Sequence, residues 1–565
     1  MKFCEYTYKR PDVEALLTAI ESMTKRIETA LGAEEQIAVI KELDQACADY
    51  NTMNTICMIR HTIDTRDTYY KEENTFFDEN GPRVSNAVNG LMSAVMSSAF
   101  RPELEERLGS FFFEKQEYNA KSMTEEIIPL MQEENVLCSR YNELYASAQI
   151  PFMGQVLTVE QMVPYKASPD REVRKAAYQA EGEFFDSHRT EFDEIYDSLV
   201  KNRTAQAQAL GYENFVPLGN IRMRRFGYGA DEVKYFRSQV VEHLVPVVDQ
   251  IKAMQAKRIG VGEDFKAYDD LVLFADRNAM PKGNPTELKE KAQKMFGELS
   301  KETKEFFDFM MEHELLDVES KSGKAPGGYC ATIDNYKAPF IFSNFNGSHE
   351  DVVVLTHESG HAFESYVGSR IDFEVDAHRG YSSETAEVHS MAMEFLTQRW
   401  HDLFFEEETA KFELQHNEHA LSFIPYACII DAFQYSAYEN PQWTPEERNK
   451  EWQRLLTVYQ PYLTDYEDIP FYSRGGGWQY KLHTYLYPLY YIDYALAEVV
   501  ALQFYLMDLD DHEKAWETYY RFVCLAGTMR FADAVKACGL KSPFEPGCVK
   551  EVAEQVMAWI ETHQM

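Results

Sequence analysis

Apolar residues recur at intervals of three and four over most of this sequence, and that spacing constrains the fold more than any other feature. It is the period of one buried face of an α-helix. The pattern is clear in residues 11–31, 52–73 and 123–149, where charged side chains fill the positions between the apolar ones. We therefore expect a mainly α fold.

Two stretches in the first half of the chain mark the expected organisation of the helices. Residues 150–167 are expected to form a short β-hairpin, and residues 168–211 return to the helical period. That second run has Ser168 as its expected N-cap and Pro169 at its first helical position. Gly211 ends the run, and irregular sequence follows it, so we place a lobe boundary there.

Residues 326–347 depart from the helical period. Glycine turns alternate there with short β-prone runs, and residues 338–345, APFIFSNF, predict a strand in a small sheet. A free edge of this strand would allow an extended peptide to pair with it near Phe340 and Ile341. A purely structural strand is the alternative.

The predicted strand leads into the stretch VVVLTHESGHAFESY, residues 352–366. His357 and His361 are four residues apart, so on a helix they share a face, one turn apart, and can hold one metal ion. Glu358 lies beside them, where it can act on a water molecule without being a ligand. The flanking apolar residues imply a buried helix, in which unpaired imidazole and carboxylate groups would be costly. Because the chain has 15 histidines, a chance match on a solvated face is the alternative.

The ends of this helix and its packing can also be predicted. Ser348 followed by Asp351 has the spacing of a capping box, with Ser348 as the N-cap. Gly368 is a plausible end of the helix. Gly360, between the two histidines, leaves room for the close approach of another segment or a ligand.

A zinc site needs a third protein ligand, with water in the fourth position. Glu364 and Val367 occupy the positions where a metzincin has glycine and histidine, so that class is excluded. A carboxylate from a following helix is the remaining source. We expect such a helix to begin at Ser382 or Ser383.

Three glutamates on that helix are candidates. Glu387 and Glu394 are seven residues apart and therefore share a face, which suits a metal ligand and an acceptor for an imidazole N–H. Glu384 is the competing ligand, although its position at the helix start suits a solvated role better. The spacing alone favours Glu387 only modestly.

Charge and composition limit the partners and the location. The net charge of −37 and the pI near 4.8 would repel nucleic acid and anionic lipid, so we expect neither as a partner. The first residues contain no apolar segment typical of a secretion signal. The most membrane-like run, residues 487–507, contains Asp493 and Glu498, which favours a buried core helix. Nine cysteines without C-x-x-C pairing indicate reduced thiols and a cytoplasmic location.

These motifs resemble the thimet oligopeptidase and oligoendopeptidase F family of zinc peptidases. The resemblance lies in two motifs, HESGH and EVHSMAME. The second begins at Glu387, thirty residues after His357, the first residue of HESGH. KAPFIFSNFNG and YYIDY make the oligoendopeptidase F branch the closest. The resemblance implies one zinc ion per chain, with Glu358 as the general base and Glu394 in a supporting role. The implied zinc ligands are His357, His361 and Glu387.

A second part of the resemblance lies in residues 474–498, RGGGWQYKLHTYLYPLYYIDYALAE. The family has a glycine-rich loop there, followed by a histidine and a tyrosine cluster over the substrate. The resemblance implies that Gly475, Gly476 and Gly477 form a mobile loop that contacts substrate, with a simple turn as the alternative.

The same resemblance implies that His483 and two tyrosines contact the substrate and the transition state. Tyr491 and Tyr494 are three residues apart, so on a helix they share a face, and Tyr494 is the better candidate for stabilising the oxyanion. The spacing from His483 leaves Tyr490 and Tyr491 as alternatives for the other tyrosine. Without the resemblance, a tyrosine-rich apolar helix is more often part of a core.

The resemblance implies a zinc-dependent metalloendopeptidase that hydrolyses short unstructured oligopeptides, in which Glu358 assists attack by a zinc-bound water. It also implies two helical lobes beside a deep substrate channel, with a small sheet next to the histidine helix. We assign residues 1–211 to an N-terminal helical lobe and residues 212–565 to the catalytic domain. The alternatives are a zinc carboxypeptidase or dipeptidyl carboxypeptidase, a peptide-binding module without catalysis, and an unrelated scaffold. The sequence leaves open whether the metal is zinc or cobalt, the substrate preference and the oligomeric state.

Overall fold

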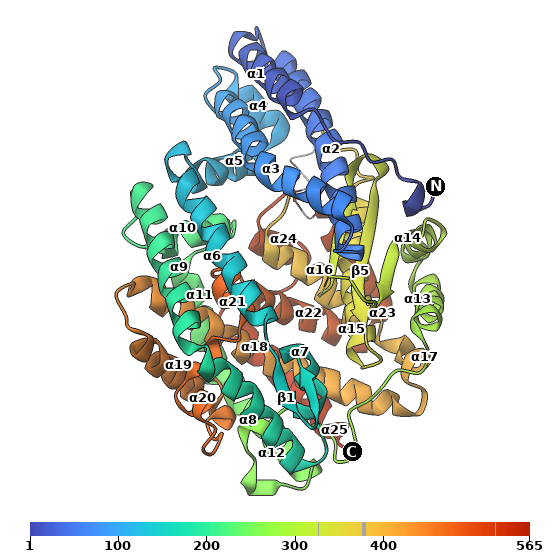
Figure 1. Ribbon diagram of the computed structural model, residues 1–565. Helices are drawn as coiled ribbons and strands as arrows, with labels where there is room; N and C mark the ends of the chain where they lie inside the picture. Colours follow the sequence, from blue (N-terminus) through green and yellow to red (C-terminus); the bar gives the residue numbers. More distant parts are fainter. Residues whose placement is uncertain (326, 376–379, 526) are drawn as a thin grey trace. The chain divides into compact units, whose positions relative to one another are not determined.

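The computed structural model describes residues 1–325, 327–375, 380–525 and 527–565. Most of these residues are helical and the described sheets are small, so the expected mainly α fold is confirmed (Figure 1). The chain forms two compact units. Unit 1 contains Met1–Ala120, Met280–Thr409 and Val500–Leu540, and unit 2 contains Lys121–Ala279, Ala410–Val499 and Lys541–Met565. The predicted lobe boundary at Gly211 and the predicted channel stay predictions.

Unit 1 opens with three long helices that pack on one another, drawn in blue in Figure 1. They are α1 (Val13–Thr29), α2 (Ala33–Ile63) and α3 (Thr68–Met96). The stretch of residues 52–73, predicted to be helical, is interrupted between the end of α2 and the start of α3. The break is stabilised by Asp67, whose carboxylate accepts hydrogen bonds from the first backbone N–H groups of α3.

Shorter helices complete unit 1. Two of them, α13 and α14, form a packed pair before the sheet, and α23 packs on α15 and α16. The helices are α4 (Arg101–Leu108), α5 (Ser110–Ser122), α13 (Pro285–Leu299), α14 (Lys301–Glu312), α15 (Glu350–Gly368), α16 (Ser383–Leu396), α17 (His401–Phe405), α23 (His512–Leu525) and α24 (Phe531–Ala537).

The sheet of unit 1 contains the predicted strand, but in its centre. β5 (Ala338–Phe345) pairs in parallel with β3 (Leu316–Glu319) and antiparallel with β4 (Tyr329–Ile333). The expectation that β5 offers a free edge is therefore wrong, and Phe340 and Ile341 are 1% and 0% exposed. The sequence pattern identified the strand, but strand order depends on long-range pairing that periodicity does not encode.

The turn from β5 into α15 is held by a different residue from the one expected. Ser348 does not cap the helix. Instead, the Asp351 carboxylate in the first turn accepts backbone N–H groups from Asn346 at 2.9 Å and from Gly347 at 2.7 Å. The capping box is thus wrong, because the carboxylate binds the turn that precedes the helix. The predicted end of α15 at its last glycine is confirmed.

α16 begins at the predicted serine and packs along α15. The helices meet at Gly360, where an added Cβ would lie 2.4 Å from the carbonyl oxygen of His389 and 2.6 Å from Cα of Ser390. No side chain fits at those distances, so the absence of a Cβ permits this approach. The predicted close contact at Gly360 is confirmed.

Unit 2 contains the predicted hairpin in a shorter form. β1 (Ile150–Phe152) and β2 (Gln155–Leu157) pair antiparallel, but the following residues form α7 (Val159–Lys166). The strand prediction for that part was wrong because Thr158 starts a helix. Its hydroxyl accepts the N–H of Gln161, and the Gln161 side chain binds the Thr158 N–H in return.

The helical run of residues 168–211 is divided in two, α8 (Arg171–Ser187) and α9 (Arg189–Ala209). The N-cap of α8 is Asp170 and not Ser168, because the Asp170 carboxylate accepts hydrogen bonds from two N–H groups of the first turn. Gly211 has φ +86° and lies just beyond the last residue of α9, as predicted.

The apolar run of residues 487–507 lies mostly in α22 (Ile492–Asp510), whose residues belong to unit 2 up to Val499 and to unit 1 from Val500. It is a core helix in which Asp493 and Glu498 are also buried, as predicted. Across the described residues, no helix combines the length and apolarity of a membrane span. Further helices of unit 2 are α6 (Ile128–Ala146), α10 (Phe215–Arg222), α11 (Ala230–Gln239), α12 (Val245–Arg258), α18 (Thr409–Glu439), α19 (Pro445–Tyr459), α20 (Pro470–Ser473), α21 (Leu482–Leu486) and α25 (Cys548–Thr562).

Candidate functional site

Three predicted metal ligands converge in unit 1. The rings of His357 and His361 on α15 have centroids 5.0 Å apart and an interplanar angle of 82°. Glu387 on α16 reaches both, with its Oε2 atom 3.4 Å from Nε2 of His357 and 3.5 Å from Nε2 of His361. Their candidate ligand atoms all lie within 4.8 Å of one another. The three residues that the resemblance implied as ligands thus lie together in the structure.

The cluster fits a tetrahedral divalent ion. Ligand atoms at about 2.0–2.2 Å from such an ion are separated by roughly 3.3–3.6 Å, and two imidazoles with one carboxylate are an established zinc donor set. The observed separations of 3.4 and 3.5 Å lie in that range. The residues present therefore suit zinc.

Glu394 fixes which nitrogen of His357 faces the cluster. Its Oε1 atom lies 2.7 Å from Nδ1 of His357, so Nδ1 carries the proton and Nε2 points toward Glu387. This is the arrangement predicted from the seven-residue spacing of Glu387 and Glu394. It holds the ring in an orientation that a metal can use.

The charges of the cluster are strongly coupled. Although burial alone would raise it, the His361 and His357 imidazoles hold the pKa of Glu387 well below its ordinary value. Burial alone would lower the pKa of His357, but hydrogen bonds to Glu387 and Glu394 raise it well above its ordinary value. The carboxylates thus favour a positive charge at His357, and a divalent ion would take the place of the imidazole proton.

Glu358 is buried beside the cluster, close enough to interact electrostatically with both imidazoles. Its side chain is 8% exposed, and in the described part of the chain its Oε2 atom has no hydrogen-bond partner. Burial, the largest influence, raises the pKa of this carboxyl above its ordinary value although the neighbouring imidazoles oppose the rise. A buried carboxylate oxygen without a hydrogen-bond partner is costly, which favours a functional reason for its position.

Two further residues of α16 change the sequence-based account. Glu384 is fully buried, so its expected solvated role is wrong, and it does not belong to the ligand cluster among the described residues. Ser390 was missed. Its hydroxyl lies 3.1 Å from Oε2 of Glu387 and donates a hydrogen bond to it. The i, i+3 spacing from Glu387 is the signal that could have identified it.

The predicted histidine and tyrosines gather in unit 2. The ring of His483 lies 4.8 Å from that of Tyr491 and 6.4 Å from that of Tyr494, and the two tyrosine rings are 5.5 Å apart. Tyr491 precedes the first residue of α22, so the expectation that both tyrosines lie on one helix is wrong. Tyr490 also stacks on His483, at 6.0 Å. The choice between Tyr490 and Tyr491, and the substrate contact itself, stay predictions.

The glycine-rich segment Gly475–Gly477 forms a tightly packed turn within unit 2. A Cβ on the first glycine would lie 2.3 Å from the carbonyl oxygen of Asn449, and one on the second would lie 2.7 Å from the ring of Phe471. At the third, the indole nitrogen of Trp452 would lie 3.0 Å away. Packing thus gives a structural reason for all three glycines, and their contact with substrate stays a prediction.

Comparison with known proteins assigns the chain to a family. Residues 3–123 match the Peptidase M3 N-terminal domain, and residues 164–553 match Peptidase family M3. The chain belongs to peptidase family M3. Family membership indicates a peptidase.

Solved structures of the family agree over the entire chain. Pz peptidase A, solved with an inhibitor, is 44% identical with a TM-score of 0.94, and the match covers 100% of both chains. A putative oligoendopeptidase F from Bacillus anthracis is 40% identical with a TM-score of 0.89, covering 100% of this chain and 98% of that one. These similarities confirm the predicted oligoendopeptidase F branch of family M3.

Curated relatives match over a shorter region. Oligoendopeptidase F, chromosomal, of Lactococcus lactis subsp. cremoris is 27% identical over 207 residues, which are 35% of this chain and 32% of that protein. The oligoendopeptidase F homolog of Borreliella burgdorferi is 21% identical over 484 residues, 81% of this chain and 79% of that protein. The chain thus spans about a third of the length of the first of these relatives.

Proposed function

We propose that this M3 protein is a zinc-dependent metalloendopeptidase that cleaves short unstructured peptides. The observation that supports it most is the convergence of His357, His361 and Glu387, with Nδ1 of His357 held by Glu394. Similarity to proteins named oligoendopeptidase F supports peptides as the substrate class. A cytoplasmic location stays a prediction of the sequence.

The proposed chemistry assigns each residue a role. When bound by the trio, zinc would polarise the scissile carbonyl and lower the pKa of a water molecule. Glu358 accepts the proton of the attacking water and later gives it to the leaving amine. Its buried position suits this role, because burial raises the pKa of the carboxyl and so makes it a better proton acceptor than an exposed glutamate. Tyr494 and His483 are the proposed hydrogen-bond donors to the developing oxyanion.

Glu358→Gln tests this assignment most simply. The variant is expected to bind one zinc ion per chain, measured by elemental analysis, and to lose cleavage of an internally quenched peptide by at least about 100-fold. Glu350→Gln, an exposed change in the first turn of the same helix, is the matched control and is expected to retain activity. Near-native cleavage by Glu358→Gln would overturn the mechanism.

Peptides blocked at both ends separate the proposal from its alternative. An endopeptidase cleaves inside an acetylated and amidated peptide, and mass spectrometry identifies the internal bond. A carboxypeptidase or dipeptidyl carboxypeptidase would instead release one or two residues, and only from a free C-terminus. If the protein released only one or two C-terminal residues, and only from unblocked peptides, the endopeptidase proposal would be replaced by this alternative.

A further inference from the structure

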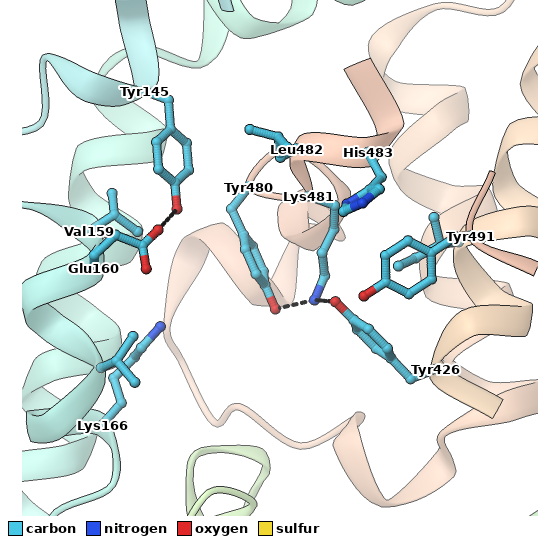
Figure 2. Close-up of a pocket in the computed structure, with 12 residues that line it drawn as sticks. Tyr145, Val159, Glu160, Lys166, Tyr426, Tyr480, Lys481, Leu482, His483 and Tyr491 are labelled. Atoms are coloured by element: carbon cyan, nitrogen blue, oxygen red, sulfur yellow. Dashed lines mark hydrogen bonds between the residues drawn. The ribbon is translucent and has the colours of Figure 1, made fainter. Parts of the chain in front are cut away.

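Unit 2 contains a cavity of about 250 Å³ with a lysine at its centre (Figure 2). Nζ of Lys481 donates hydrogen bonds to the hydroxyl oxygens of Tyr426 at 2.8 Å and Tyr480 at 2.6 Å. It also lies 4.2 and 4.0 Å from the centres of these two rings. His483 and Tyr491 line the same cavity. We call these five residues the Lys481 pocket.

The positive charge of Lys481 is not matched by a carboxylate in contact. Within the described residues, no carboxylate oxygen lies within 4.0 Å of its Nζ atom. The two carboxylates that act on it from farther away, Glu181 and Asp270, each have a lysine of their own. Glu181 pairs with Lys166 at 2.7 Å, and Asp270 pairs with Lys252 at 2.6 Å.

The acidic side chain that lines the cavity, Glu160, does not contact Lys481 either. Glu160 is exposed at the cavity wall and accepts a hydrogen bond from the hydroxyl of Tyr145 at 3.0 Å (Figure 2). Burial lowers the pKa of Lys481 well below its ordinary value, which is the sign of a cation in an unfavourable place. An anion brought into contact with the ammonium would relieve that cost.

The lining chemistry identifies the kind of anion. Each phenol that accepts a hydrogen bond from the ammonium keeps its own O–H, so Tyr426 and Tyr480 can donate to a ligand oxygen. An ammonium with two O–H donors matches the two oxygens of a carboxylate. The surrounding rings can cover the apolar atoms that carry it.

We propose that the Lys481 pocket binds a carboxylate of the peptide ligand, either the C-terminal carboxylate or that of an Asp or Glu side chain. This inference rests on the proposed function for the identity of the ligand as a peptide. His483, which the proposed function places at the substrate, lines the same cavity. Lys481 is then a specificity-determining residue.

The test compares three versions of one peptide that contains no other acidic residue. One has a free C-terminal acid, one a C-terminal amide, and one a C-terminal amide with a single internal Asp. Binding is measured by calorimetry on zinc-loaded Glu358→Gln protein, so that no turnover is needed. A charge-assisted contact is expected to make at least one carboxylate version bind about 10- to 100-fold tighter than the uncharged amide. The version that gains identifies the source of the carboxylate.

Variants assign the gain to Lys481. Lys481→Met is expected to remove the preference while binding the uncharged amide as before, and Lys481→Arg is expected to retain it. Lys201→Met removes one exposed positive charge from the same unit and serves as the matched control. Lys481→Gln is a second neutral variant should the first fail to fold.

Two results would overturn the proposal. One is equal binding of all three peptides by the protein with Lys481 intact. The other is a preference for carboxylate that survives in a folded neutral variant. A protein that shows the preference but cleaves no peptide would instead contradict the proposed function and leave the pocket in place.

Discussion

Gly360→Ala is a direct test of the packing that brings the histidines and Glu387 together. An alanine Cβ would lie 2.4 Å from the carbonyl oxygen of His389, whereas such contacts essentially never fall below 3.0 Å. The two helices must therefore separate by at least 0.6 Å, the difference between these distances. Both colliding groups at this contact, the carbonyl of His389 and Cα of Ser390, are backbone and cannot rotate away.

The expected cost follows from two opposing terms. Overpacking of this kind costs about 1–3 kcal/mol, and replacing glycine by alanine within a helix returns about 1 kcal/mol. The net effect on unfolding is thus a loss of up to about 2 kcal/mol. Metal affinity is more sensitive, because a site tolerates only about 0.2 Å of error in its ligand distances. We expect zinc to bind at least about 10-fold more weakly.

Zinc affinity is measured by competition with a chromophoric chelator, and stability by urea unfolding of the metal-free protein. Gly297→Ala in α13 is the matched control, because an added Cβ there meets nothing within 4 Å. It is expected to stabilise the protein by up to about 1 kcal/mol and to leave zinc binding unchanged. If Gly360→Ala bound zinc as tightly as the parent protein without loss of stability, the reasoning would be refuted.

Three further predictions concern single side chains. Glu394→Ala leaves Nδ1 of His357 without its acceptor and is expected to weaken zinc binding about 10- to 100-fold, in the same chelator assay; unchanged affinity would contradict its supporting role. Tyr494→Phe is expected to lower kcat about 100-fold with little change in KM, and equal effects on both would reduce Tyr494 to substrate binding. Burial raises the pKa of Asp193 from 3.8 to about 6, so the folded protein favours the protonated carboxyl. The contribution of this group to folding stability is therefore fully present below pH 3.8 and is lost as pH rises through 6. Urea unfolding should therefore show Asp193→Asn gaining about 1–2 kcal/mol relative to the parent protein between pH 4 and 7, whereas a constant difference would contradict the shift.

The cluster of two histidines and a glutamate was predictable because its parts are local in sequence. Two histidines one helical turn apart, and two glutamates two turns apart, each fix a face of one helix. What joins the faces is the contact at Gly360, and the sequence marked that position only as one with room. The choice of Glu387 over Glu384 also needed the structure, because both are buried and only Glu387 faces the imidazoles.

Other features could not be predicted because they depend on residues distant in sequence. The order of strands placed β5 between β3 and β4 and so buried the edge that Phe340 and Ile341 were expected to offer. The role of Asp351, by contrast, is local: its carboxylate binds the N–H groups of Asn346 and Gly347, an arrangement that competes with the capping box that its spacing suggested. Lys481 belongs to no motif, and its significance appears only once the charges around it are paired.

X-ray absorption at the zinc edge tests the central claim most directly. The account predicts one tightly bound zinc per chain, with two imidazole nitrogens and a carboxylate oxygen among its nearest neighbours, and loss of that zinc when Glu387 is replaced by alanine. A sulfur neighbour, or a zinc that stays in place in the Glu387→Ala protein, would contradict it.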